Sequence, residues 1–249
     1  PFVILLRYFI KMPKLKRKIG IRCHMMKKLK ILGMELDNYT VWEAMGKVEG
    51  FLNTTIMNTV EAVSMEMLVK AQADSFLKEC IEGLDLAIIS DKEILKAAGE
   101  VSSLRMRETV ENAFLKEFMR RVSRNHRIVY LLGDTREQLE ELRVFLHENY
   151  NKVKIAGDYA LADCMGDYDA VINEINIAAP DVILSVIATP GQEGFLKENK
   201  EKFNAKIWYG LGAGYAAKRG VSEVAGFARK MLHKGMMLSM LLRYKKNEE

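Results

Sequence analysis

The second half of the chain alternates short apolar runs with helical patterns, and this alternation constrains the fold more than any other feature. The runs are apolar throughout, which is typical of strands buried on both faces of a sheet. Predicted strands lie at residues 126–134, 151–159, 180–188 and 205–214, with predicted helices between them at 135–150, 166–179 and 193–203. Strands that alternate with helices form parallel sheets, and right-handed crossovers carry the helices to both faces. The sequence therefore predicts an α/β fold with a parallel sheet and helices on both faces.

The first half of the chain continues this pattern less regularly. It predicts strands around residues 60–63 and 84–90 and a short strand leading into a turn at 27–36. Helices are predicted at 40–54, from Met65 onward, from Ser90 or Asp91 onward, and at 105–125. Ligands of open parallel sheets bind beyond the carboxyl ends of the strands. The loops of interest therefore follow Val63, Ile89, Leu132, Ala156, Ala188 and Gly210.

The composition fits one large domain with an appendage at each end. The chain has 249 residues, of which 49% are hydrophobic and 29% charged, as in soluble globular proteins. We expect a basic and apolar extension at 1–26, the α/β domain at 27–230, and a basic helix or tail at 231–249. The N-terminal basic run predicts a solvated tail or a contact with anionic lipid. The cysteines, which fit a reducing cytoplasm and show no metal-ligand spacing, are Cys23, Cys80 and Cys164.

The stretch IATPGQEGFLKEN, at residues 187–199, is the first candidate site. Thr189 at an N-cap and Gln192 three residues later match a capping box, with Pro190 as the first helical residue. The same geometry suits a ligand, because free N–H groups at a helix start attract phosphate and Gly191 allows a close approach. Gln192 and Glu193 can hydrogen-bond a sugar. Both interpretations remain open on the residues alone.

Two further features carry weaker signals. The glycines of GLGAG at 210–214 resemble part of a dinucleotide fingerprint, but they follow the last predicted strand, where a tight turn is the alternative. Asp91 follows a predicted strand and is either a general base or a helix cap. The four histidines show no metal-like spacing, and no G-x-S-x-G motif occurs.

Several motifs in the chain, taken together, resemble the WecG/TagA/CpsF family of bacterial glycosyltransferases. The resemblance covers most of the chain from about Lys28, and it rests on the order and spacing of motifs that are weak alone. The motifs are Leu132-Gly133, Ile175-Asn176, Pro180-Asp181, Pro190-Gly191-Gln192-Glu193 and Gly210-Leu211-Gly212.

The resemblance implies a Rossmann-like core and the transfer of an N-acetylmannosamine-type sugar. The donor would be a UDP-sugar and the acceptor a polyprenyl-diphosphate-linked sugar, in teichoic acid or surface polysaccharide synthesis. The implied enzyme uses no metal or cofactor, binds no nucleic acid, and works in the cytoplasm at the inner face of the membrane, with a homo-oligomer as one option. Asp91 matches the family's base. The implied substrate-binding residues are Ser64, Gly133, Pro190, Gly191, Gln192, Glu193, Gly210 and Gly212.

The chain departs from the family pattern at several polar positions, which are Ala62, Lys92, Gly191 and Ala216. These departures motivate an alternative, a catalytically impaired homologue that binds nucleotide-sugar or docks a partner. A dinucleotide-dependent oxidoreductase, suggested by GLGAG alone, ranks last.

Overall fold

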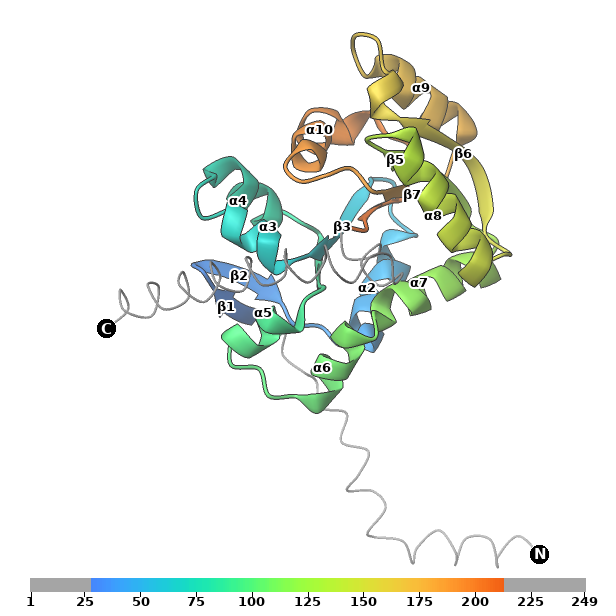
Figure 1. Cartoon of the computed structure of the whole chain (residues 1–249). Coiled ribbons are helices and arrows are strands. Elements are labelled where there is room, and N and C mark those ends of the chain that lie inside the picture. The colour runs from blue at the N-terminus through green and yellow to red at the C-terminus, as the bar shows by residue number, and fades with distance from the viewer. Residues whose placement is uncertain (1–27, 213–249) are drawn as a thin grey trace, which may run out of the picture.

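A computed structural model describes residues 28–212 and contains a six-stranded parallel sheet (Figure 1). The strands lie in the order β4-β3-β8-β7-β5-β6, and each neighbouring pair is parallel. Their bounds are β3 Asn58–Val63, β4 Leu86–Ile89, β5 Ile128–Gly133, β6 Lys154–Ala160, β7 Val182–Ser185 and β8 Ile207–Gly210. The predicted α/β, Rossmann-like fold class is confirmed. The extensions predicted at 1–26 and 231–249 lie outside the described residues.

Alternate residues of the central strands are buried against different helices. In β5, Val129 and Leu131 belong to one apolar cluster, whereas Tyr130 and Leu132 belong to another. The first face is covered by α2 (Val41–Phe51), α7 (Ala113–Arg124) and α8 (Arg136–Asn149). The opposite face is covered by two separate clusters (Figure 1). One contains α3 (Met65–Lys70), α4 (Ser75–Glu82) and α5 (Lys92–Ala97), and the other contains α9 (Asp169–Ala178) and α10 (Gly191–Asn199).

Three parts of the chain form other elements than the sequence predicted, and local backbone conformation or capping explains each of them. The strand and turn expected at 27–36 form a hairpin of β1 (Lys28–Ile31) and β2 (Met34–Asp37), because Leu32 and Gly33 both adopt positive φ, as a type I′ turn requires. The helix expected from Met65 is two helices, since Asp74 accepts the N–H of Leu77 and starts α4 anew.

The helix expected at 105–125 is likewise two, α6 (Ser103–Val110) and α7. Asn112 lies between them and has a φ of 52°, in the left-handed region that Asn tolerates better than most residues. A right-handed helix cannot continue through a residue in this conformation, so the helix is interrupted here. Two 3₁₀ turns, η1 (Leu161–Asp163) and η2 (Lys200–Lys202), complete the described elements.

The strand order places a topological switch point between β5 and β7. The connection after β5 leads to β6 on one side, and the connection after β7 leads to β8 on the other. Asp134, directly after β5, accepts the N–H of Ala188 with its Oδ2 at 2.7 Å. The carboxyl ends of β5 and β7 are therefore tied together, at the edge where ligands of such sheets bind.

Candidate functional site at the carboxyl edge of the sheet

Asp91 and Ser64, two of the predicted site residues, lie together at the carboxyl ends of β4 and β3. Asp91 Oδ2 accepts the backbone N–H of Met65 at 2.8 Å, and Ser64 caps α3 by accepting the N–H of Met67 at 3.2 Å. Both side chains are half-buried. Asp91 stands at the N-cap position of α5, but its side chain makes no capping hydrogen bond there. The alternative prediction, that Asp91 caps the helix that follows it, is therefore wrong. The Asp91 carboxylate instead accepts a hydrogen bond from the first residue of α3.

The turn at 187–191 does not form the predicted capping box. Helix α10 begins at Gly191, so Pro190 occupies the N-cap position and no side chain caps the helix. Thr189 instead donates its hydroxyl to Glu193 Oε1 at 3.0 Å. Pro190 and Gly191 are exposed, whereas Gln192 and Glu193 are buried. The turn therefore presents a backbone edge to solvent while its two polar side chains point into the protein.

Gln192 is held in the interior by a residue that the sequence analysis did not select. Its side-chain nitrogen Nε2 donates to Oε1 of Glu61, which lies in β3 and is 2% exposed. Glycine at position 210 makes room for this amide, because a Cβ there would lie 2.5 Å from Gln192 Nε2. Gly210 thus serves the packing of Gln192 in this structure.

Glu61, Gln192 and Glu193 form a buried acidic cluster with incomplete hydrogen bonding. Within the described part of the chain, no N–H or hydroxyl group donates to Glu61 Oε2, Gln192 Oε1 or Glu193 Oε2. Burial, then the charge of the nearby Glu193 carboxylate, and then a hydrogen bond between the two side chains raise the pKa of Glu61 well above its ordinary value, so the two carboxyl groups share a proton. A glutamate inside the apolar run of a central strand was the sequence signal for this cluster, because acidic residues are rarely buried without a partner.

The remaining predicted glycines have packing and backbone roles in the structure. Gly133 is buried at the end of β5, where a Cβ would lie 3.1 Å from Val186 Cγ2. Gly212 has a φ of +62° and lies so close to β3 that a Cβ would be 3.1 Å from the Ala62 oxygen. The tight-turn interpretation is therefore supported at Gly212, whereas Gly210 is the last residue of β8. Ala216 lies outside the described residues.

A lysine from another element stands beside the exposed turn. Lys70, the last residue of α3, donates its Nζ to the carbonyl oxygen of Thr189 at 3.4 Å and pairs with Glu66 at 3.3 Å. The resemblance implies a lysine at the position of Gly191, a cation that this turn lacks. The structure brings a different cation to the same place, from a residue 119 positions away.

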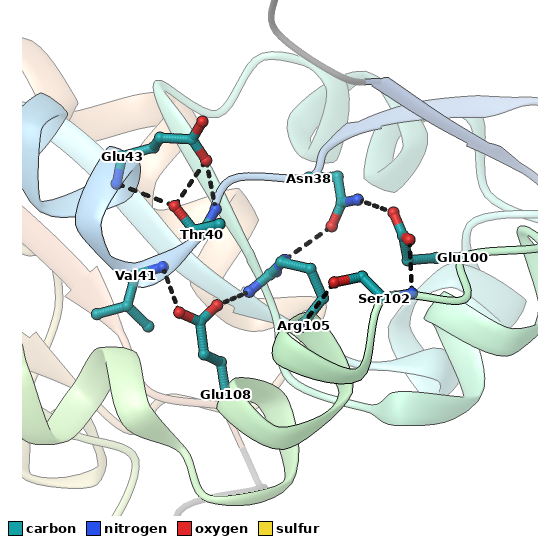
Figure 2. Close-up of polar contacts among 8 residues, drawn as sticks. All are labelled: Asn38, Thr40, Val41, Glu43, Glu100, Ser102, Arg105 and Glu108. Carbon is teal, nitrogen blue, oxygen red and sulfur yellow. Dashed lines mark hydrogen bonds and ion pairs between the residues drawn. The ribbon is translucent and has the colours of Figure 1, made fainter. Parts of the chain in front are cut away.

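A second buried polar cluster lies between α2 and α6 and has a different character (Figure 2). Arg105 donates to Asn38 Oδ1 at 2.9 Å and to Glu108 Oε2 at 2.7 Å. Glu108 Oε1 also accepts the N–H of Val41 at 3.3 Å, and Glu100 accepts from Asn38 and from the N–H of Ser102. Both oxygens of Glu100 and both oxygens of Glu108 accept a hydrogen bond, so the network joins the start of α2 to α6 with its carboxylates satisfied.

Within residues 28–212, no group of three or more metal-ligating side chains is close enough to hold an ion. The same residues include no helix of the length and apolar character needed to cross a bilayer.

The fold and its polar carboxyl edge define a Rossmann-like α/β protein whose candidate ligand site spans the ends of β3, β4, β7 and β8. The sequence profile of the glycosyl transferase WecG/TagA/CpsF family matches residues 29–222. The chain belongs to this family.

Curated relatives resemble it at low identity over most of their length. The chain is similar to proteins named N-acetylglucosaminyldiphosphoundecaprenol N-acetyl-beta-D-mannosaminyltransferase from Staphylococcus aureus strains MRSA252 and NCTC 8325. In each case 21% of residues are identical over 221 positions, which cover 88% of this chain and 86% of the relative.

Proposed function

We propose that the protein transfers an N-acetylmannosamine-type sugar from a UDP donor to a polyprenyl-diphosphate-linked acceptor sugar. The observation that carries this proposal is the family membership together with the position of Asp91 at the carboxyl edge. The relatives described above bear the name of a transferase with this sugar and acceptor. Their names favour turnover over the non-catalytic alternative.

Asp91 is proposed as the general base. It would take the proton of the acceptor hydroxyl as that oxygen attacks the anomeric carbon of the donor, while the bond to the UDP oxygen breaks and UDP leaves. The hydrogen bond from Met65 N–H fixes one carboxylate oxygen and so orients the group. Ser64, on the adjoining helix start, is proposed to bind substrate beside it.

The donor diphosphate is proposed to lie at the start of α10. Gly191 is exposed there, and the helix is nine residues long, so its first N–H groups favour an anion. Lys70 brings a positive charge to the Thr189 carbonyl beside this turn. Gln192 and Glu193 would support the turn from the buried side, and Gly133, Gly210 and Gly212 would shape the sheet edge under the nucleotide.

Because the proposed acceptor is anchored in lipid, the protein would act at the inner membrane surface. That location is part of the proposal and rests on the acceptor's chemistry. A homo-oligomer remains compatible with it.

The experiment compares two aspartates that occupy matching positions at opposite ends of β4. Asp91 Oδ2 accepts the N–H of Met65, and Asp85 Oδ2 accepts the N–H of Thr59, both at 2.8 Å. Turnover is measured with UDP-N-acetylmannosamine and N-acetylglucosaminyl-diphosphoundecaprenol, and UDP binding by calorimetry. Loss of a general base typically costs roughly 100-fold to 10,000-fold. We therefore expect Asp91→Asn to lose that much turnover while it retains UDP affinity, and Asp85→Asn to retain turnover. Equal turnover in the two variants would remove Asp91 from this role.

A further inference from the structure

Asp134 is fixed at the switch point of the sheet by hydrogen bonds on both sides of its backbone. Its N–H donates to Gln138 Oε1, in the first turn of α8, at 2.9 Å. Its carbonyl oxygen accepts the N–H of Ala162, in the 3₁₀ turn η1, at 2.9 Å. The backbone of Asp134 is therefore tied both to the helix after β5 and to the turn after β6, and its side chain is half-buried between them.

The carboxylate of Asp134 reaches across to the loop after β7. Its Oδ2 accepts the N–H of Ala188 at 2.7 Å. The carbonyl oxygen of Ala188 accepts the N–H of Gln192 at 3.2 Å, so the peptide groups on both sides of Ala188 are held. Ala188 is exposed and belongs to no helix or strand. A hydrogen bond to a charged acceptor is stronger than one between neutral groups, so Asp134 fixes the path of this loop out of the sheet.

The other end of the same loop is anchored to a different strand. Gln192 donates its side-chain N–H to Glu61 in β3. Residues 188–192 therefore run from the switch point beside β5 to a position above β3, which lies three strands away in the order β3-β8-β7-β5. Pro190 and Gly191 lie between the two anchors and are exposed. The part of the turn proposed to hold the donor diphosphate is thus held from both ends.

We propose that Asp134 is a positioning residue for donor binding, which holds Ala188 so that the N–H groups at the start of α10 face the diphosphate. This inference rests on the function proposed above, because it needs a donor diphosphate at Gly191. Asp134 acts through the backbone of the turn, far from the proposed base. Strands β5 and β4 are four steps apart in the sheet, about 19 Å at about 4.8 Å a step. Loss of Asp134 should therefore weaken donor binding and leave the catalytic step unchanged.

The charge of Asp134 makes the test sharper. A carboxylate beside a diphosphate repels it, because like charges destabilise each other. Asp134 therefore helps the donor to bind through its hydrogen bond to Ala188 and against its own charge. Asn offers a carbonyl oxygen to the same N–H but carries no charge, whereas Ala offers no side-chain acceptor. The two substitutions separate the hydrogen bond from the charge.

The test uses the full chain and measures UDP affinity by calorimetry, and kcat and both KM values with UDP-N-acetylmannosamine and N-acetylglucosaminyl-diphosphoundecaprenol. We expect Asp134→Ala to weaken UDP binding and raise the donor KM roughly 10-fold, the scale of a hydrogen bond to a charged group, with kcat and the acceptor KM within about two-fold of the wild type. Asp134→Asn should bind UDP as well as the wild type or more tightly.

Asp163→Ala is the matched control for the lost carboxylate. Asp163 lies in η1 at the same edge of the sheet, but it pairs with Arg136 at 2.9 Å and not with the turn at 187–191. This variant should leave UDP affinity, kcat and both KM values unchanged. Hydrogen exchange of the free protein then checks the contact without a donor. Asp134→Ala should speed amide exchange in a peptide covering 187–193 several-fold, whereas Asp134→Asn and Asp163→Ala should not.

The outcomes separate this inference from the function on which it rests. UDP affinity or amide exchange that is unchanged in Asp134→Ala would overturn the inference and leave the proposed function standing. Equal weakening in Asp134→Ala and Asp134→Asn would also overturn it, because the hydrogen bond would then not be the cause. An acceptor KM that rises as much as the donor KM would show general damage to the fold instead. A wild type that binds no UDP would contradict the proposed function itself, and this inference with it.

Discussion

The two buried polar clusters of this protein differ in how fully their hydrogen bonds are satisfied. In the network around Arg105, all four oxygens of Glu100 and Glu108 accept a hydrogen bond (Figure 2). In the cluster around Glu61, the Gln192 amide donates to Glu61 and the Thr189 hydroxyl donates to Glu193. No N–H or hydroxyl of the described residues reaches the other oxygens of Glu61, Gln192 and Glu193, and the two carboxyl groups share a proton instead. Both clusters are buried, so their difference is one of chemistry and not of exposure.

The difference separates a network held by fixed donors from a cluster held by a shared proton. An unsatisfied buried acceptor costs about 1–3 kcal/mol, and the proton that Glu61 and Glu193 share lowers that cost in the second cluster. The Arg105 network connects the hairpin and α2 with α6, and no part of it needs an outside partner. The Glu61 cluster interrupts the apolar packing of one sheet face, between the two clusters of core residues there.

The largest expected effect comes from breaking the satisfied network. Arg105→Met leaves Glu108 and Asn38 without their donor, and removing one partner of a buried ion pair costs about 3–5 kcal/mol of unfolding free energy. Arg107→Met, two residues along the same helix, is exposed and should change stability by less than about 0.5 kcal/mol. Urea unfolding measures both. Similar losses in the two variants would show that the network adds nothing beyond the helix itself.

The next effect comes from crowding the Glu61 cluster. Gly210→Ala places a Cβ where the Gln192 amide lies, and overpacking of a core costs about 1–3 kcal/mol. Gly194→Ala in α10 is the matched change, because its Cβ would meet no atom within 4 Å. It should be stabilising by up to about 1 kcal/mol, since alanine is the better helix former. A neutral Gly210→Ala would mean that Gln192 can leave Glu61 without cost.

The acidic cluster also predicts how stability depends on pH. Because the folded-state pKa of Glu61 is raised, the folded chain holds a proton that the unfolded chain has lost. Stability is therefore full below the unfolded pKa of about 4.3 and falls as pH rises toward the folded pKa, with a slope of at most about 1.4 kcal/mol per pH unit. Thermal melts between pH 5 and 8 should show a smaller loss in Glu61→Gln. Parallel curves for variant and wild type would contradict the raised pKa.

The same comparison shows what the sequence could predict. The apolar runs at 126–134 and 180–188 identify buried parallel strands because their hydrophobicity is local information. The position of Asp91 at the carboxyl edge was predicted for a similar reason, since it follows the strand predicted at 84–90. The partner of Gln192 could not be found in this way, because Glu61 is 131 residues distant and only the order of β3 beside β8 brings α10 above it. The capping box at 189–192 matched the local pattern, but the tertiary contact of Gln192 with Glu61 prevailed over it.

The smallest effect concerns the exposed side of the same helix start. Lys70 contacts the Thr189 carbonyl, so Lys70→Ala removes a positive charge beside the proposed diphosphate position without touching the acidic cluster beneath. Since Lys70 is an exposed cation, we expect Lys70→Ala to lose about 1 kcal/mol or less of UDP-binding free energy, which is a few-fold in affinity. Added salt should reduce the difference in affinity between the variant and the wild type. Lys116→Ala, an exposed change on α7 across the sheet, has the same charge and should leave UDP affinity unchanged. If both variants bind UDP equally well, the cation beside this turn does not replace the one absent at Gly191, and the diphosphate relies on the backbone of α10 alone.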